Sequence, residues 1–138
     1  MLVLDTDHLT ALDANAVTGP ALQLRLEEAS DEVVATIISA EEQLRGWLAR
    51  IHVLRSVHDQ LAAYAKLQQR LAFYAEWTLL PWTTGAADRF VAFRKLGIRI
   101  GTMDLKIASI ALEHRATVLT QNLVDFGQVP GLRAESWL

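Results

Sequence analysis

The order of apolar and polar positions divides the chain into short buried strands separated by longer helices. Residues 2–4 form an apolar run that stops abruptly at Asp5, and residues 33–38 are rich in β-branched side chains. Both patterns are typical of buried parallel strands. Residues 77–80, which precede Pro81, and residues 117–119 predict two further short strands.

Between these strands, apolar residues recur at helical spacing. Leu9 and Leu12 predict a short helix, residues 14–20 a loop punctuated by Gly19 and Pro20, and residues 21–29 another helix. Ser39 is expected to begin a long helix. Further helices are expected over residues 57–75, over 86–96 with Gly97 as the cap, and over 105–112. The inward apolar stripes of the two long helices would be Leu44, Trp47, Leu48 and Ile51 in the first, and Leu61, Tyr64, Leu67, Leu71 and Tyr74 in the second.

Strands that alternate with helices imply parallel pairing through right-handed crossovers. We therefore expect an α/β fold, a three-layer α/β/α sandwich with a mostly parallel central sheet, formed by residues 1–138 as a single domain. Gln121 and Asn122 predict a turn after the last strand, and residues 129–131 predict another.

Composition narrows the class of protein. Hydrophobic residues make up 51% of the 138 positions, which is enough for one continuous core. Cysteine is absent, so neither a disulfide scaffold nor a thiolate metal site can form. The net charge of −3 argues against a protein that coats nucleic acid by bulk charge. The N-terminus lacks the pattern of a signal peptide, and no apolar run is long enough to cross a membrane. A cytoplasmic location is expected.

Acidic residues follow the predicted strands or begin the predicted helices. Asp5 ends the first strand, Glu42 lies in the first turn of the long helix, and Asp104 begins a later helix. Asn122 and Asp125 follow the last strand. The carboxyl ends of parallel strands meet at one edge of the sheet, so these residues are expected to converge there.

Clustered carboxylates require a neutralising cation, and oxygen ligands without His or Cys favour Mg²⁺, with Mn²⁺ as a substitute. Such a site suits phosphodiester hydrolysis with one or two ions. Each acid also has a simpler interpretation: Asp5 as a helix cap, Ser39 with Glu42 as a capping box, Asp104 as a dipole-favoured residue, and Asp125 as a turn residue. Only the four acids taken together specifically indicate a metal site.

Five segments in order resemble the VapC group of PIN-domain ribonucleases, across nearly the whole chain. They are Leu-Val-Leu-Asp-Thr-Asp from residue 2, Ile-Ile-Ser-Ala-Glu-Glu-Gln-Leu-Arg-Gly from residue 37, Ile-Gly-Thr-Met-Asp from residue 100, Thr-Gln-Asn-Leu-Val-Asp-Phe from residue 120, and Val-Pro-Gly-Leu from residue 129 with Trp137.

The resemblance implies a bacterial toxin that cleaves RNA, acts as a homodimer and is silenced by a VapB-like antitoxin. It also implies that Mg²⁺ is held by the catalytic acids Asp5, Glu42, Asp104 and Asp125. Thr6 and Thr120 would orient those carboxylates by hydrogen bonds, and Asn122 would lie in or beside the site. Asp7 could be a ligand, a helix cap or a residue that supports the ligands, and the last role is favoured.

In the family that the chain resembles, the Glu of this segment stands four residues before a Gly, so the position of Gly46 favours Glu42 over the adjacent Glu41 as the metal ligand. Successive helical residues point about 100° apart, so Glu41 is expected to point away from the site. Arg94, Lys95 and Arg99 precede Asp104 in the sequence and could bind RNA phosphates. Alternatively, they are solvent-exposed cations near the C-terminus of a helix, where the helix dipole favours positive charge. His8 is expected to be structural. The apolar residues of the second long helix could also serve a dimer or the antitoxin.

Two other functions fit parts of the sequence. Asp5 and Asp7 resemble the nucleophile motif of haloacid-dehalogenase-type phosphatases, with Asp5 as nucleophile and Asp7 as general acid, but the later motifs of that family are missing. A binding module without catalysis is the second. Convergence of the acids at strand ends argues against it, since an interaction surface does not need such convergence.

Overall fold

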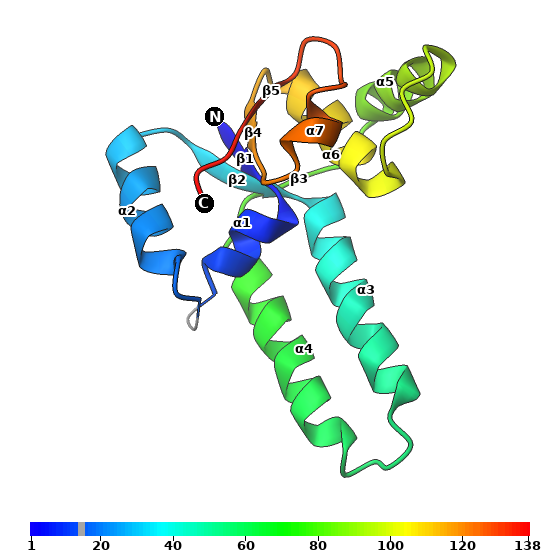
Figure 1. The fold of residues 1–138 in the computed structure, drawn as a ribbon. Helices are drawn as coiled ribbons and strands as arrows, with labels where there is room; N and C mark the ends of the chain where they lie inside the picture. Colours follow the sequence, from blue (N-terminus) through cyan, green and yellow to red (C-terminus); the bar gives the residue numbers. More distant parts are fainter. Residues whose placement is uncertain (14–15) are drawn as a thin grey trace.

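A computed structural model describes residues 1–13 and 16–138 and places five strands in one sheet, in the order β3-β2-β1-β4-β5 (Figure 1). All four pairings are parallel, and Val3 of β1 lies between Val34 of β2 and Val118 of β4. The strands are β1 Leu2–Leu4, β2 Val33–Thr36, β3 Leu79–Leu80, β4 Thr117–Leu119 and β5 Arg133–Glu135.

Seven helices connect these strands within the described parts of the chain. The helices are α1 Thr6–Ala11, α2 Gly19–Ala29, α3 Ile37–Val53, α4 Gln60–Ala75, α5 Thr84–Lys95, α6 Thr102–Glu113 and α7 Leu123–Phe126. None of the helices in residues 1–13 and 16–138 has the length and apolar character needed to cross a membrane.

The alternation of side chains along the strands divides the core into two layers. Val3, Val34 and Val118 face a cluster formed mainly with α5, α6 and α7. Their neighbours Leu4 and Leu119 face a second cluster formed mainly with α1, α2 and α4. Helices thus cover both faces of a parallel sheet, and the expected three-layer α/β/α sandwich is confirmed.

The boundary between β2 and α3 differs from the prediction. The strand ends at Thr36, and Ile37 and Ile38 already belong to α3. The Thr36 hydroxyl accepts the backbone N–H of Ser39 at 3.1 Å and caps the helix. The predicted capping box of Ser39 and Glu42 is therefore wrong, because the true cap lies three residues earlier and leaves Glu42 free for other contacts.

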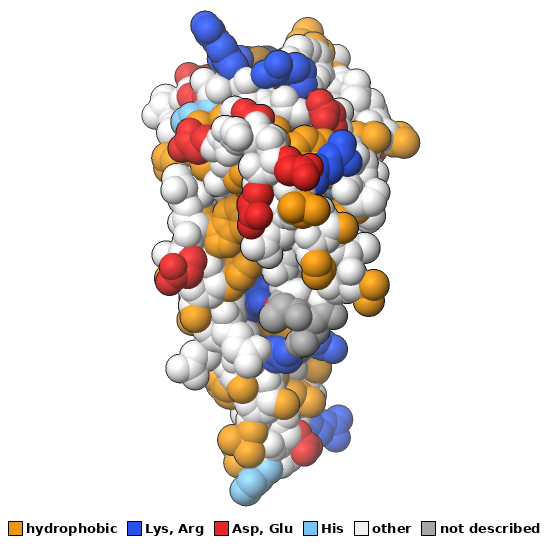
Figure 2. Space-filling view, turned by 90° about the vertical axis from the view of Figure 1, so that its left-hand side faces the viewer, with side chains coloured by type: hydrophobic (Ala, Val, Ile, Leu, Met, Phe, Trp, Pro, Cys, Tyr) orange, Lys and Arg blue, Asp and Glu red, His pale blue; other side chains and the backbone are white. Residues whose placement is uncertain are grey.

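The second long helix also differs from the prediction. The outer parts of α3 and α4 form an arm that projects away from the sheet (Figure 1). Side chains far out on this arm have no layer to cover them, so Leu61, Tyr64 and Leu71 are exposed rather than inward, whereas Tyr74 is buried as predicted. Figure 2 shows apolar side chains on the surface of this narrow end.

Three smaller features of the fold were not predicted. Gly19 and Pro20 begin α2 instead of closing the preceding loop, because proline is well suited to the first turn of a helix. Residues 14–15 of that predicted loop lie outside the described residues. The strand β5 and the short helix α7 follow segments that were expected to be turns, whereas Gly97, with a φ of 87°, ends α5 as expected.

Candidate active site

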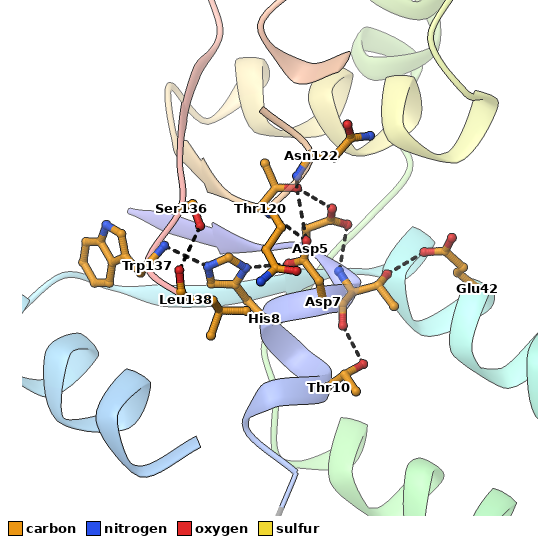
Figure 3. A network of polar contacts seen from close by, with 12 residues as sticks. Asp5, Asp7, His8, Thr10, Glu42, Thr120, Asn122, Ser136, Trp137 and Leu138 are labelled. Carbon is orange, nitrogen blue, oxygen red and sulfur yellow. Dashed lines mark hydrogen bonds and ion pairs between the residues drawn. The ribbon is translucent and has the colours of Figure 1, made fainter. Parts of the chain in front are cut away.

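Four acidic residues from separate segments gather where β1 and β4 end. Asp5 follows β1, Glu42 lies on α3, Asp104 lies in the first turn of α6, and Asp125 lies in the first turn of α7. Figure 3 shows Asp5 near the centre, with Asn122 above it and Glu42 to its right. The parallel sheet explains this arrangement, because every crossover returns the chain to the same edge.

Asp5 is held from two sides. Its side chain is 6% exposed, and one carboxylate oxygen accepts the backbone N–H of Thr6 at 2.7 Å. The other oxygen accepts the hydroxyl of Thr120 at 2.8 Å, across a sequence separation of 115 residues. The first contact makes Asp5 the cap of α1, so the simple interpretation of this residue is correct in geometry. The same contacts fix the direction in which the carboxylate faces.

Glu42, and not Glu41, points into the site. Its Oε2 accepts the hydroxyl of Thr6 at 2.5 Å, so Thr6 joins the acid on α3 to the end of β1. Glu41 points elsewhere and forms an ion pair with Arg45, one turn further along the helix. The register inferred from Gly46 agrees with this arrangement.

Asn122 bridges the other two acids. Its side-chain amide donates to Asp104 Oδ2 at 3.0 Å and to Asp125 Oδ2 at 2.9 Å. Its backbone N–H donates to the hydroxyl oxygen of Thr120 at 3.0 Å, and that hydroxyl in turn donates to Asp5. The side-chain amide of Asn122 therefore draws two carboxylates together, and its backbone N–H connects them through Thr120 to the third.

Asp7 belongs to a neighbouring hydrogen-bond network. It accepts the backbone N–H of Gln121 at 2.7 Å, and its other oxygen lies 2.5 Å from Nδ1 of the buried His8. His8 Nε2 accepts the backbone N–H of Trp137 at 3.2 Å, so the ring proton resides on Nδ1 and is donated to Asp7. His8 is structural, as expected. No sequence pattern predicts that His8 binds the backbone of Trp137, because the two residues lie 129 positions apart.

Two carboxylates of the site, those of Asp5 and Asp104, are electrostatically strained. Burial raises the pKa of Asp5 from its ordinary value of 3.8 to about 6, and the nearby charges of Asp7 and Asp104 add to the effect. Burial also raises the pKa of Asp104, with contributions from Glu42 and Asp125. Burial opposes ionisation of Asp7 as well, but hydrogen bonds from His8 and Gln121 lower its pKa overall. Asp5 and Asp104 are therefore the acids that a cation would relieve most.

The donor set fits a hard divalent cation. All four acids offer oxygen, and their mutual repulsion is the feature that a bound cation would remove. No three acidic or histidine side chains among residues 1–13 and 16–138 form a ready-made coordination sphere. Mg²⁺ does not require one, because it usually keeps several waters and takes one or two protein carboxylates.

The predicted RNA-contacting cations differ in their surroundings. Arg94 donates to the carbonyl oxygens of Ile98 and Ile100, both at 2.9 Å, and lies over the ring of Phe90. Its guanidinium thus holds the connection between α5 and α6. Lys95 and Arg99 are exposed, so an RNA contact stays a prediction for them.

The comparisons with known proteins agree with the fold. A chain from a DNA-bound VapBC structure of Salmonella typhimurium superposes with a TM-score of 0.75 at 22% identity, covering 99% of this chain and 98% of that one. A VapBC2 structure from Rickettsia felis, bound to a promoter DNA fragment, gives 0.71 at 21% identity with the same coverage. VapBC-1 from nontypeable Haemophilus influenzae gives 0.71 at 20% identity, covering 99% and 97%.

Sequence comparison adds a local match. The chain is 44% identical over 41 residues to Ribonuclease VapC2 of Rickettsia felis, which covers 30% of this chain and 31% of that protein. No profile of a known protein family matches the chain. The chain has the fold found in these VapBC complexes, and its resemblance to the VapC group of PIN-domain proteins, indicated by the five segments, is confirmed.

Proposed function

We propose that this chain is a Mg²⁺-dependent endoribonuclease and the toxin of a type II toxin–antitoxin pair. Asp5, Glu42, Asp104 and Asp125 would hold the cation, with Mn²⁺ as a substitute. The local similarity to Ribonuclease VapC2 of Rickettsia felis supports ribonuclease activity. The observation that carries the proposal is the placement of Asn122: its side-chain amide contacts both Asp104 and Asp125, and its backbone N–H connects them through Thr120 to Asp5.

The side chains around the acids would prepare them for this chemistry. A bound divalent cation would acidify a water and stabilise the oxyanions of an in-line displacement at phosphorus. Thr120 and Thr6 hold the carboxylates of Asp5 and Glu42 in fixed directions, so little reorganisation is needed when substrate arrives. A carboxylate of the same rim would accept the proton of the attacking water.

The proposal is tested by incubating the purified protein with labelled total small RNA in Mg²⁺, in Mn²⁺ and in excess EDTA. We expect discrete fragments with either metal, none with EDTA, and none from Asp104→Asn with metal present. Fragments that persist in EDTA, or that Asp104→Asn produces at the parent rate, would refute a metal site at this rim. Absence of both RNA cleavage and Mg²⁺ binding would favour the non-catalytic binding module.

We also propose a VapB-like antitoxin as a partner, and a homodimer. The solved neighbours are VapBC complexes, which supports the antitoxin, and the exposed apolar residues of α4 offer a surface for protein contacts. Expression of this chain alone should slow bacterial growth, and Asp125→Asn should relieve the effect at equal protein level. Unchanged toxicity of Asp125→Asn would count against Asp125 as a catalytic acid.

The phosphatase alternative finds little support in the geometry around Asp7. A general acid must carry a proton and present it to the leaving group. Although burial opposes ionisation, hydrogen bonds from His8 and Gln121 lower the pKa of Asp7 and occupy both of its oxygens. We expect no hydrolysis of p-nitrophenyl phosphate under conditions in which RNA is cut.

A further inference from the structure

A cavity of about 460 Å³ opens beside the acidic site, between α3 and α4. Its wall on α3 carries Glu42, Gly46 and Arg50, which are spaced by four residues and therefore share one face of the helix. Its wall on α4 carries Lys66 and Arg70, also four residues apart. The cavity thus begins at an acid of the proposed catalytic site and continues outward between Arg50 on α3 and the two cations Lys66 and Arg70 on α4.

Two of these cations are available to a ligand. Arg70 is 9% exposed and forms an ion pair with Asp13 at 3.0 Å, so it builds the wall. Arg50 and Lys66 are exposed, and neither has a carboxylate partner within residues 1–13 and 16–138. The Arg50 guanidinium lies 4.8 Å from the ring centre of Trp47, which also lines the cavity. Unpaired cations beside an aromatic ring suit a phosphate backbone with attached bases.

Gly46 is a glycine in the interior of α3, on the face that lines the cavity. Glycine inside a helix is unfavourable, and nothing lies within 4 Å of the point where a Cβ would stand. Packing therefore does not require glycine here. Gly46 lies between Glu42 and Arg50 on the cavity face, where a longer side chain would project into the opening. A ligand that passes from Arg50 to the acidic site would account for this residue.

We propose that this cavity binds the single-stranded RNA segment next to the bond that is cut, with Arg50 and Lys66 contacting its phosphates. The proposal rests on the proposed function, because it takes the acidic site as the place of cleavage. Charge complementarity identifies the occupant: a chain with a net charge of −3 places the exposed cations Arg50 and Lys66 along a cavity that begins at Glu42. Non-specific contacts of this kind set affinity and register on a nucleic acid.

The test measures binding of a fluorescein-labelled, mixed-sequence, single-stranded RNA by anisotropy, in EDTA and over a range of KCl concentrations. The variant Arg50→Ala with Lys66→Ala is compared with Arg45→Ala with Arg89→Ala, which removes the same charge from residues outside the cavity. We expect the cavity variant to weaken binding by on the order of tenfold and to lower the slope of log K against log salt by about 1.4, since each phosphate contact on a single strand contributes about 0.7. Equal Kd values and slopes for the two double variants would overturn the proposal.

A second variant guards against a general effect of charge. Gly46→Leu leaves the charge unchanged and should preserve or raise the melting temperature, because leucine favours a helix more than glycine does. It should nevertheless weaken RNA binding by narrowing the cavity. A Gly46→Leu protein that folds and binds RNA with the parent Kd would show that RNA does not bind in this cavity.

Failure of this inference can be told apart from failure of the proposed function. If the parent cuts RNA with Mg²⁺ but the cavity variant binds like its control, the nuclease stands and the cavity assignment falls. If the cavity variant alone loses binding while the parent cuts no RNA, the cavity assignment stands and the nuclease falls.

Discussion

At the scale of single residues, the hydrogen bonds of Asp5 and its burial have opposite effects on the free energy of its charged form. Its carboxylate caps α1 and accepts the Thr120 hydroxyl, but its burial disfavours the negative charge. A residue that keeps a costly charge in a buried position is typical of functional sites. The cost is measurable as protein stability, independently of any activity.

We predict that Asp5→Asn stabilises the metal-free protein at pH 8. The folded pKa of about 6 exceeds the ordinary value of 3.8, so the native state binds the proton more tightly than the unfolded state. The parent therefore loses stability as pH rises from about 4 to about 6 and stays at the lower level above that, a difference of up to about 3 kcal/mol.

Urea unfolding in EDTA at pH 4 and pH 8 checks this prediction. Asp5→Asn should gain roughly 1–3 kcal/mol over the parent at pH 8 and much less at pH 4. A variant that is less stable than the parent at pH 8 would show that the carboxylate is not strained in the folded protein.

Much of the site could be predicted at this scale, because Asp5, Glu42 and Asp104 each lie next to a recognisable strand end or helix start. The resemblance also implied that Thr6 and Thr120 orient the carboxylates, but not which carboxylate each of them contacts. Thr120 and Asp5 are separated by 115 residues, and a sequence pattern carries no distance between two such side chains. Arg94 shows the same limit, since its bonds to backbone carbonyl oxygens depend on the conformation of the α5–α6 connection.

At the scale of elements, the start of α3 decides where Glu42 points. Thr36 ends β2 and caps the helix through the N–H of Ser39, which frees Glu42 to meet Thr6. The sequence favoured Ser39 as the cap because Ser-Ala-Glu-Glu matches the capping-box pattern and residues 37–38 are β-branched. Both signals are local, whereas the true boundary depends on the register between β2 and its neighbours in the sheet.

Thr36→Val tests this capping assignment. The variant keeps the side-chain volume and removes the hydroxyl, and we expect it to destabilise the protein by about 1 kcal/mol. Glu42→Gln serves as the comparison: if Glu42 were part of the cap, its loss would destabilise the protein by a similar amount. Thermal unfolding of both variants distinguishes the two arrangements, and an unaltered Thr36→Val would contradict the cap.

At the scale of the whole molecule, the layers follow from the alternation of strand residues, and the three-layer sandwich could therefore be predicted. The edge strand β5 could not be predicted in this way. The strand β5 is Arg133-Ala134-Glu135, which has no apolar run because an edge strand can pair through its backbone alone. The exposure of Leu61 and Leu71 on α4 was equally hidden, since an apolar stripe does not reveal whether another layer covers it.

A metal that binds only the folded protein must stabilise the whole molecule. We predict that Mg²⁺ raises the melting temperature of the parent, with about 2.7 kcal/mol gained at a metal concentration 100 times its Kd. Asp104→Asn should lose most of this gain, because it removes a ligand charge from the rim. Equal metal-dependent shifts in the parent and in Asp104→Asn would place the cation elsewhere.

The central claim, that the acids at the strand ends form the catalytic site, is tested most directly by two adjacent glutamates. Glu42 faces Thr6 within the site, whereas Glu41 faces Arg45 on the surface. Glu42→Gln and Glu41→Gln change the charge equally, one residue apart on the same helix. We predict that the initial rate of RNA cleavage in Mg²⁺ falls by at least about 100-fold in Glu42→Gln and stays near the parent rate in Glu41→Gln. Equal rates in the two variants, or a loss confined to Glu41→Gln, would contradict the account.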